Sequence, residues 1–413
     1  MSSLRKVYVL GGYTSKFIGK GHPDFIHKKH PLFGKQVNPD LKTYLVQAIQ
    51  ETLKMNKCTG KQVDKVFVGN FAGECFSQQG HIGSGISEAD AGLLYKPSYR
   101  LEAACASGGV AFNAAVDSIL AGTSDVALVV GAEEQNTVSA REGAAHLAKA
   151  ADFNRQRVLD EFTFPALYAT RKMHYLKKYG SIVKSEDVEK VAFKAYQAGN
   201  KNPLAQMFTS KLDHQGIIDS PKFLSNPEIK DFLKMCECSQ VSDGGAGLLV
   251  LSEEGLQKLG LKHSDAIEVL ASEVAIGNLY QDTPETFSDL LTTYAAAKRA
   301  YKKAGVSPSD VSIAEVHDCF AIAEVGMNEA LGFSKPGEGA FLHLTKPMVN
   351  TGGGLISFGH PVGATGVKQI NEVFKQMKGK AGDYQLNGSL EVGVCANMGG
   401  NDKTSVVSIF KNL

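Results

Sequence analysis

Apolar positions along the chain follow two alternating spacings. Short apolar runs, such as "KVYVLGG" from Lys6 and "DVALVVGA" from Asp125, predict buried strands. Longer stretches, such as "DLKTYLVQAIQETLKM" from Asp40 and "GGVAFNAAVDSILAG" from Gly108, place apolar residues every three or four positions and predict helices. Because strand and helix patterns alternate, the chain is predicted to be an α/β protein with a largely buried sheet.

The same order of patterns occurs twice. The helix, turn and strand that start at Thr43 ("TYLVQAIQETLKMNKCTGKQVDKVFVGN") resemble those that start at Thr293 ("TYAAAKRAYKKAGVSPSDVSIAEVHD"). The reactive tripeptide, glycines, helix and strand that start at Cys105 have a counterpart from Gly359. We interpret this as an internal duplication in which equivalent turns of the two halves face each other. Chance similarity between α/β segments is the alternative.

The segment between the halves differs in its residue pattern. We therefore predict an inserted loop domain at 139–239. The N-terminal half would span 1–138 and be completed by 240–265, and the C-terminal half would span 266–413. Basic residues gather in the insertion, and they form either a solvated helix face or an anion-binding surface. They are Arg155, Arg157, Arg171, Lys172, Lys177 and Lys178.

Composition narrows the class of protein. The chain has 413 residues, 43% hydrophobic and 21% charged, as expected for a globular protein of two or three packed units. A net charge of +1 provides no general basic field, so a nucleic-acid binder is not expected. The longest apolar runs fall well short of the roughly 20 residues that a membrane span needs.

Two features favour an intracellular location. The N-terminal "MSSLRKVYVLGG" passes directly into a strand pattern, which leaves no room for a cleavable signal. Seven cysteines, an odd number at irregular spacing, suit a reducing compartment better than a disulfide framework.

Cys105 and His360 are candidates for a nucleophile and its base. Cys105, in "ACASGG", precedes a helix pattern that begins with small residues, and the positive end of that helix is expected to lower the pKa of the thiol. His360, in "FGHPVGATG", opens the equivalent helix of the second half, so the duplication would bring it to Cys105 as a general base. Taken singly, each has a plain structural alternative, a buried cysteine and a turn histidine.

The stretch "HDCF" places His317, Asp318 and Cys319 side by side after a strand pattern. Consecutive side chains diverge, so they cannot all face one metal ion, and Cys236 with Cys238 has no matching second pair of ligands. No metal site is predicted. The loop is expected instead to direct His317 and Cys319 into a site that is built from several loops.

Four loops in this order, "ACAS", "HDCF", "FGHP" and the late cysteine turn "VCANMGG", resemble those of the thiolase family. They are most similar to the SCP2-thiolase (sterol carrier protein 2 type) branch, where H-D-C-F stands in place of N-E-A-F, and the likeness covers nearly the whole chain. The resemblance implies a duplicated thiolase fold, with two αβαβα halves in a five-layered core and an inserted loop domain. No carrier domain is expected after the last motif.

The resemblance also implies an activity. A thiolase is an acyltransferase of fatty acid metabolism that cleaves a 3-ketoacyl-CoA with CoA into acetyl-CoA and a shortened acyl-CoA, or runs the reverse Claisen condensation. Coenzyme A would be a substrate, no separate cofactor would be needed, and the chain would form a homodimer. A ketoacyl synthase of the same fold and a non-catalytic acyl-CoA-binding protein are the alternatives.

Site residues follow from the resemblance position by position. Cys105 would carry the acyl group as a thioester, and His360 would activate it and help to hold the thioester oxygen of the second substrate. His317 would replace the family's asparagine, which positions a water molecule there. The second acid/base would be Cys319, as in the SCP2 branch, or Cys395 in the late turn, and the sequence leaves this choice open.

The same comparison assigns substrate contacts. Ser239 would contact the pantetheine arm, and Phe320 would line the same tunnel. Asn397 replaces the glycine of the family's late turn, so this chain departs from the family pattern at the second oxyanion hole. The C-terminal "KNL" only loosely resembles the peroxisomal Ser-Lys-Leu signal, so the peroxisome, the cytoplasm and the mitochondrion all stay open.

Overall fold

The computed structural model describes residues 5–344 and 348–413. Its strands are β1 (Tyr8–Thr14), β2 (Lys65–Gly69), β3 (Ser98–Leu101), β4 (Val126–Glu133), β5 (Gly244–Leu251), β6 (Ile267–Ile276), β7 (Ile313–Val316), β8 (Met348–Val349), β9 (Val392–Gly399) and β10 (Thr404–Asn412). Its α-helices are α1 (Leu41–Met55), α2 (Gly73–Phe76), α3 (Ser107–Leu120), α4 (Ala140–Leu147), α5 (Phe153–Gln156), α6 (Thr163–Tyr179), α7 (Ser185–Gly199), α8 (His214–Ile218), α9 (Glu253–Lys258), α10 (Pro284–Ser288), α11 (Leu291–Ala304), α12 (Ala321–Ala330) and α13 (Thr365–Met377).

The strand order shows the duplication directly. The described strands form one sheet in the order β3-β2-β4-β5-β1-β6-β10-β9-β7-β8, which repeats outward from the central β1–β6 pair. In the first half β2 is parallel to β3 and β4, while in the second half β7 is parallel to β8 and β9. The antiparallel pairs β4–β5 and β9–β10 also correspond. The predicted internal duplication is therefore confirmed.

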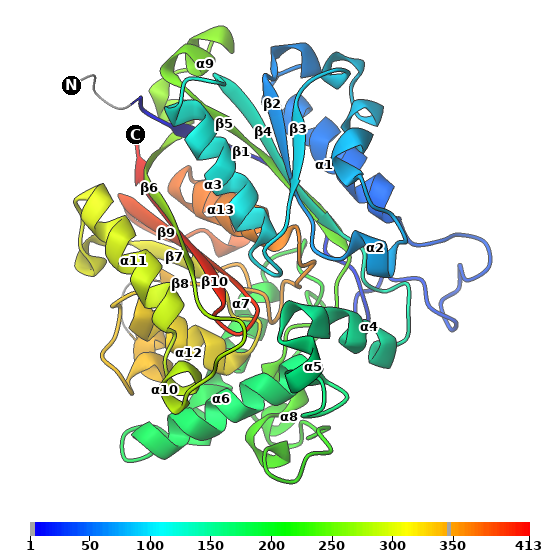
Figure 1. Ribbon diagram of the computed structural model, residues 1–413, viewed down its shortest axis with the longest axis vertical. Coiled ribbons are helices and arrows are strands. Elements are labelled where there is room, and N and C mark those ends of the chain that lie inside the picture. The colour runs from blue at the N-terminus through cyan, green and yellow to red at the C-terminus, as the bar shows by residue number, and fades with distance from the viewer. Residues whose placement is uncertain (1–4, 345–347) are drawn as a thin grey trace.

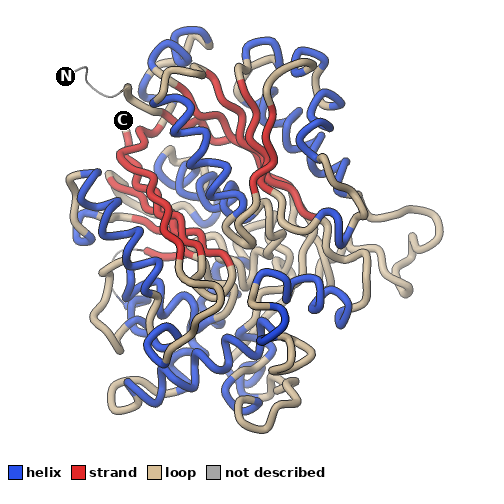
Figure 2. Tube along the Cα trace, viewed as in Figure 1, coloured by secondary structure: helices blue, strands red, loops and turns tan. Residues whose placement is uncertain are grey.

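Helices α3 and α13 lie between the two halves of the sheet (Figures 1 and 2). Each contacts strands of both halves: α3 packs on β2 and β4 as well as β6, and α13 packs on β7 and β9 as well as β1. The outer faces are covered by α1 on one side and by α11, with α12 beside it, on the other. The result is a layered core of helix, sheet, helix, sheet and helix.

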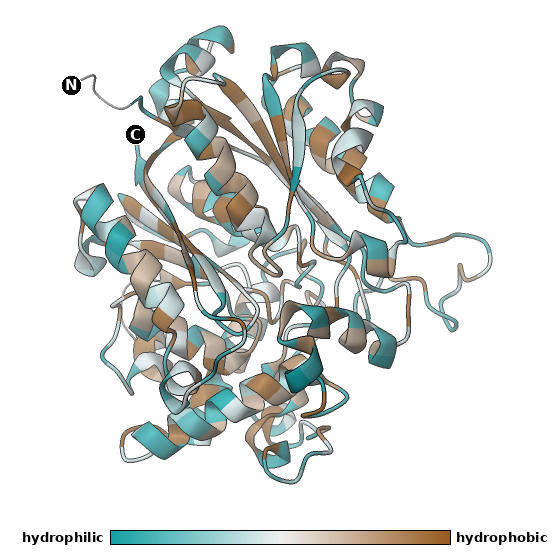
Figure 3. Cartoon of the chain, viewed as in Figure 1, coloured by the Kyte–Doolittle hydropathy of each residue, from teal (hydrophilic) through white to brown (hydrophobic). Residues whose placement is uncertain are grey.

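The hydropathy of the chain follows these layers. Strands β4, β5 and β9 are buried at every position, whereas α1 and α11 bury one face and expose the other (Figure 3). Twelve of the thirteen residues of α13 are buried, although several are polar or charged. A helix that is covered on all sides must satisfy such groups internally, and one of them, Lys368, pairs with buried Glu315 at 3.2 Å.

The starts of α3 and α13 meet through glycine. A Cβ on Gly108 would lie 2.8 Å from the carbonyl oxygen of Gly363, and a Cβ on Gly366 would collide with the backbone nitrogen of Gly109. These positions admit no side chain, so the two backbones approach more closely than any other residue would allow. Cys105 and His360 precede these two helix starts, which places them on facing loops.

The predicted insertion, 139–239, carries α4 to α8 and contributes no strand to the described sheet. Two of its basic residues are buried, contrary to the expectation that they lie on the surface. Arg171 is 2% exposed and Lys172 is 1% exposed, and Lys172 donates to buried Glu237 at 2.6 Å. They form neither a solvated helix face nor an anion-binding surface, because folding buries Arg171 against the core and Lys172 within the insertion.

Across residues 5–344 and 348–413, no helix combines the length and the apolarity that crossing a lipid bilayer would require.

The glycine contact predicts the effect of a single methyl group. Gly366→Ala should lower the free energy of unfolding by about 1–3 kcal/mol, because the added Cβ forces the starts of α3 and α13 apart. Urea unfolding followed by circular dichroism measures this change. Gly85→Ala is the control, because its Cβ would meet only Leu45 at 3.8 Å. Equal unfolding midpoints for the two variants would contradict the account of the glycine contact.

Candidate active site

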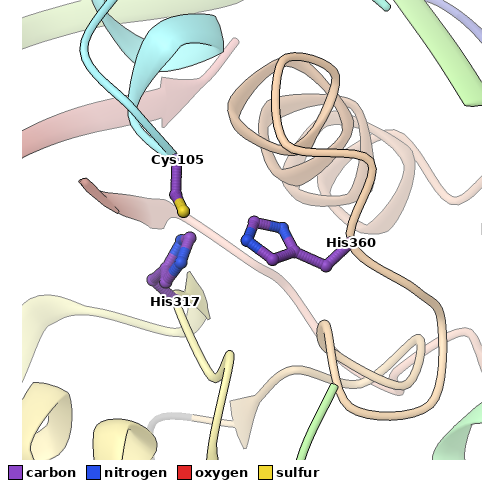
Figure 4. Close-up of side chains that lie close together, drawn as sticks. All are labelled: Cys105, His317 and His360. Atoms are coloured by element: carbon purple, nitrogen blue, oxygen red, sulfur yellow. The ribbon is translucent and has the colours of Figure 1, made fainter. Parts of the chain in front are cut away.

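Three loops bring Cys105, His317 and His360 together. Cys105 precedes α3, His317 follows β7, and His360 precedes α13, and Figure 4 shows their side chains pointing toward one another. The sulfur and one ring nitrogen of each histidine all lie within 4.8 Å of one another. The imidazole rings meet edge to face, with their centroids 5.0 Å apart. The duplication thus produces the Cys–His proximity that the sequence predicted.

A tight turn presents Cys105. Ala104 has a φ of 51°, a left-handed conformation that is strained for a residue with a side chain. The hydroxyl of Ser107 holds this turn, since it accepts from the Ala103 amide at 3.0 Å and donates to the Ala104 carbonyl at 2.6 Å. Glu102 accepts from the Ala104 amide at 2.6 Å. The strain is therefore held in place by side chains on both sides of the cysteine.

The thiol of Cys105 is more protected than the sequence suggested. Burial raises its pKa to about 12, while backbone N–H groups of Gly400 and of Cys105 itself act in the opposite direction. The expectation of a lowered pKa is wrong, because desolvation outweighs these backbone N–H groups. The two N–H groups remain available to the oxygen of an acyl group on this sulfur. Gly400 was missed in the sequence, where only the glycine-rich late turn pointed to it.

His360 is held as a neutral base. Its Nδ1 lies 2.6 Å from the hydroxyl oxygen of Thr365, which donates its own hydrogen to the Pro361 carbonyl at 2.9 Å. That oxygen must therefore accept from Nδ1–H, so the other nitrogen, Nε2, carries a lone pair. Nε2 has no hydrogen-bond partner among the described residues, and burial lowers the pKa of His360 to about 3. An unprotonated nitrogen facing a thiol is the arrangement of a general base.

The loop of His360 is anchored to the first half of the chain. Its amide donates to the Ser242 hydroxyl at 2.9 Å, and the next amides, of Val362 and Gly363, donate to Gln135 at 3.0 Å and to Glu133 at 2.9 Å. Buried Glu133 also accepts from the loop that follows β2. These bonds tie the base to the half of the molecule that carries the nucleophile.

His317 is held in the opposite tautomer. The side-chain amide of Asn397 donates to the Cys105 carbonyl at 3.1 Å and accepts from the Gly109 amide at 3.0 Å, which fixes its orientation. Its NH₂ group also faces Nδ1 of His317 at 3.2 Å, so Nδ1 accepts and Nε2 carries the hydrogen. Burial and His360 lower the pKa of His317 well below its usual value. Nε2 of His360 is therefore a hydrogen-bond acceptor, and Nε2 of His317 is a donor.

The three consecutive residues of "HDCF" have separate tasks. Asp318 turns away from the site and accepts from the Leu355 amide at 2.6 Å, which supports the turn that leads to His360. Cys319 lines the same pocket as Cys105, and burial raises the pKa of its thiol well above the usual value. The stretch therefore supplies two side chains to the site and one structural carboxylate.

Cys395, the alternative acid/base, lies elsewhere. It is buried in β9, on the face that packs against α13, near Glu315 and Lys368. It is not among the residues that line the pocket, and burial raises the pKa of its thiol. The structure therefore brings Cys319, and not Cys395, to the cavity beside Cys105.

The pocket has a volume of about 170 Å³ and mostly apolar walls. Five predicted residues line it: Cys105, Ser239, Cys319, Phe320 and His360. The remaining walls include Ala144 and Leu147 of α4 and Phe164 of α6, which the sequence did not single out. His317 and Asn397 contact Cys105 or its neighbours from behind the pocket surface.

The grouping of one thiol and two imidazoles also has the size of a metal site. A metal-binding histidine normally donates its second ring N–H to an acceptor. His360 does so, but His317 faces the NH₂ group of Asn397, so its Nε2 carries a hydrogen and has no lone pair for a metal. The hydrogen-bond pattern therefore favours proton transfer over metal binding.

A duplicated α/β fold that places a cysteine and a histidine on facing helix starts defines a thiol-dependent acyltransferase. Family models agree: the N-terminal domain of thiolase matches residues 33–254, and a thiolase C-terminal domain-like model matches residues 281–412. The chain belongs to the thiolase family. The predicted resemblance and the acyltransferase class are confirmed.

Relatives and solved structures agree with this assignment. Acetyl-CoA acetyltransferase of Methanocaldococcus jannaschii is 33% identical over 92% of this chain and 96% of the relative. Human sterol carrier protein 2 is 28% identical over 99% of this chain and 72% of the relative. The Acat5 thiolase of Ascaris suum, solved with coenzyme A, superposes with a TM-score of 0.71 at 16% identity over 99% of this chain and all of that one. The duplicated thiolase fold is confirmed.

The tautomer of His360 predicts the effect of removing one hydroxyl. Thr365→Val keeps the shape of the side chain but removes the acceptor for Nδ1–H, so part of the population should place the hydrogen on Nε2. Turnover should fall by about 10- to 100-fold, within the range for a disturbed general base. Thr365→Ser retains the hydroxyl and should stay within about threefold of wild type. Steady-state kinetics of both variants decides this, and equal rates would show that Thr365 does not control the tautomer.

Proposed function

We propose that the protein is a 3-ketoacyl-CoA thiolase (acetyl-CoA C-acyltransferase), which cleaves a 3-ketoacyl-CoA with CoA and also catalyses the reverse condensation. The observation that carries this proposal is the second thiol, Cys319, in the pocket of Cys105 and His360. Thiolysis needs a nucleophile for the acyl group and a separate group that moves the proton of the acetyl-CoA carbon. These two tasks match the two thiols.

In the first half-reaction His360 accepts the proton of Cys105, and the sulfur attacks the 3-keto carbon. The backbone N–H groups of Cys105 and Gly400 hold the developing oxyanion. The bond between C2 and C3 then breaks, and the acetyl-CoA enolate keeps its thioester oxygen near Nε2–H of His317 and of the now protonated His360. Cys319 gives its proton to C2, which leaves acetyl-CoA and an acyl group on Cys105.

The second half-reaction restores the enzyme. The Cys319 thiolate takes the proton of an incoming CoA thiol, and the CoA sulfur attacks the carbonyl carbon of the Cys105 thioester. The shortened acyl-CoA leaves, and Cys105 regains its proton from His360. Every proton is returned, so the two histidines and two thiols suffice and no separate cofactor takes part.

The shape of the site bears on the substrate. An apolar cavity of about 170 Å³ suits a short, unbranched acyl group better than a steroid side chain. Ser239 and Phe320 lie on its wall, in keeping with contacts to the pantetheine arm of CoA. Because Arg171 and Lys172 are buried, the CoA phosphates must meet other basic residues.

Assembly and location are part of the proposal. A homodimer is supported by β3, an edge strand of the described sheet that carries exposed Tyr99, and by the exposed apolar side chains of Leu94 and Tyr95 just before it. An intracellular location, in the peroxisome or the cytoplasm, is supported by the seven cysteines, all of which are free. A ketoacyl synthase would share the cysteine and both histidines, but its reaction would not need the second thiol.

The proposed reaction has a direct test. Purified protein given acetoacetyl-CoA should carry an acetyl group on Cys105, detected by peptide mass spectrometry, and should form acetyl-CoA when CoA is added. Cys105→Ala should lose both, with a rate at least about 10⁴-fold lower, because the covalent route is removed. Cys75→Ala, outside the pocket, serves as the control. Turnover without an adduct on Cys105 would contradict the covalent mechanism.

The two candidate acid/base cysteines give opposite expectations. Cys319→Ala should still accept an acetyl group on Cys105, but it should lose at least about 10²-fold in turnover, because the proton at C2 has no donor. Cys395→Ala should lose less than about tenfold, because its thiol lies in the packed layer beside α13. Steady-state thiolysis measures both variants. A nearly normal Cys319→Ala together with an inactive Cys395→Ala would reverse the assignment.

A further inference from the structure

Tyr168 approaches the site from the inserted segment. It lies on α6, is completely buried, and stacks its ring on Phe320 with the centroids 4.3 Å apart. Its hydroxyl donates to the Gly400 carbonyl at 3.2 Å. Phe320 directly follows Cys319, so the stacked tyrosine ring lies beside the second thiol. Burial raises the pKa of that thiol, and the Tyr168 hydroxyl opposes the rise. It therefore stands between the second thiol and the turn that supplies an N–H group to Cys105.

A buried cation lies on the same face of α6. Arg171 follows Tyr168 by three residues, and its guanidinium carbon is 5.8 Å from the centre of the tyrosine ring. It bonds to the side-chain oxygen of Asn401 at 2.7 Å and to the carbonyls of Thr286, Phe287 and Asp289 at 3.0 to 3.2 Å. These partners are neutral oxygens, so much of the positive charge stays available to nearby groups. Burial raises the pKa of nearby Asp402, and the positive charge of Arg171 opposes this rise.

The charges around Cys319 act in opposite directions. Burial, Cys105 and Asp318 raise the pKa of the Cys319 thiol, while the Tyr168 hydroxyl and the Arg171 guanidinium lower it. Neighbouring Cys238 also faces this thiol and is itself kept neutral by burial. Among the described groups that act most strongly on this thiol, the two that favour a negative sulfur both lie on α6.

The proposed reaction creates that negative sulfur in every cycle. When Cys319 gives its proton to C2 of the departing acetyl-CoA, a thiolate remains in an apolar pocket, where an unpaired anion is costly. A hydroxyl that donates to a neutral carbonyl at rest can turn to the thiolate, and hydrogen bonds to an ionised acceptor are roughly twice as strong. The hydroxyl returns to Gly400 once CoA has reprotonated the sulfur.

We propose that Tyr168, with Arg171 beside its ring, is a positioning residue that stabilises the thiolate form of Cys319 during turnover. This inference rests on the proposed thiolase function and extends it to a hydroxyl supplied by the insertion. No bond to Tyr168 forms or breaks. The proton moves from the Cys319 sulfur to C2 and is replaced from the CoA thiol, while the tyrosine hydroxyl only redirects its hydrogen bond.

The experiment removes one oxygen and keeps the ring stacking. Given acetoacetyl-CoA, Tyr168→Phe should acetylate Cys105 at a rate within about twofold of wild type, because the C2–C3 bond breaks before Cys319 gives its proton. Exchange of the C2 hydrogens of acetyl-CoA with deuterated solvent should fall by about 10- to 100-fold, the range expected for a poorly supported acid/base. In a Cys105→Ala background, the pH midpoint for alkylation of Cys319 by iodoacetamide should rise when Tyr168→Phe is added.

Tyr175→Phe is the matched control. Tyr175 lies on the same helix, is equally buried, and donates its hydroxyl to Glu329, away from the pocket. The Tyr175→Phe variant should have lower thermal stability, but the same C2 exchange rate and the same alkylation midpoint as the protein with Tyr175. Identical exchange and alkylation profiles for Tyr168→Phe and Tyr175→Phe would overturn the inference. Failure of the wild-type protein to acetylate Cys105 would instead overturn the proposed function.

The charge of Arg171 gives a second, independent comparison. Arg171→Lys and Arg171→Met both lose most of the hydrogen bonds to Asn401 and the three carbonyls, but only the lysine variant keeps the positive charge. C2 exchange should be at least about tenfold faster in the lysine variant than in the methionine variant, when both are assayed well below their melting temperatures. Equal exchange rates would overturn the role of the charge. This pair also keeps the inference testable if Tyr168→Phe folds poorly.

Discussion

The close approach of the starts of α3 and α13 is the constraint on which the rest of this structure depends. Only glycine fits where Gly108 meets Gly363 and where Gly109 meets Gly366, so the two backbones touch without intervening side chains. The loops that precede these helices must then face each other at short range, and they carry Cys105 and His360. Asn397 sits at the same contact and bonds to the Gly109 amide, the Cys105 carbonyl and the ring of His317. One packing contact therefore sets the geometry of three site residues.

Much of the fold could be predicted from the sequence, because hydrophobic periodicity and the repeated order of patterns are local signals. The alternation of strands and helices, the duplication and the facing loops all follow from such signals. Sequence also identified Cys105, His317, Cys319 and His360, which carry unusual chemistry in short motifs. It left the choice between Cys319 and Cys395 open, because pattern alone does not show that Cys395 faces a packed layer.

The remaining features depend on contacts between residues far apart in the chain. No local pattern shows that the Gly400 amide meets the Cys105 sulfur, or that the Asn397 amide fixes one histidine tautomer while Thr365 fixes the other. The protonation of the site was misjudged for the same reason. A helix end can be predicted from sequence. The burial that raises the pKa of Cys105 cannot, because it arises only when all layers of the fold pack together.

The position of β1 has a consequence for how this protein is made. Although β1 is the first strand of the chain, it lies at the centre of the sheet and pairs with β5 and β6, whose residues follow more than two hundred positions later. Its contacts with α13 come later still, and only its contacts with α1 can form early. During synthesis this strand must therefore wait, unpaired, until most of the chain has left the ribosome, and such long-range pairing makes folding slow. Since the site draws on residues from 105 to 400, its groups cannot meet before residue 400 has been made, so a shorter nascent chain lacks part of the site.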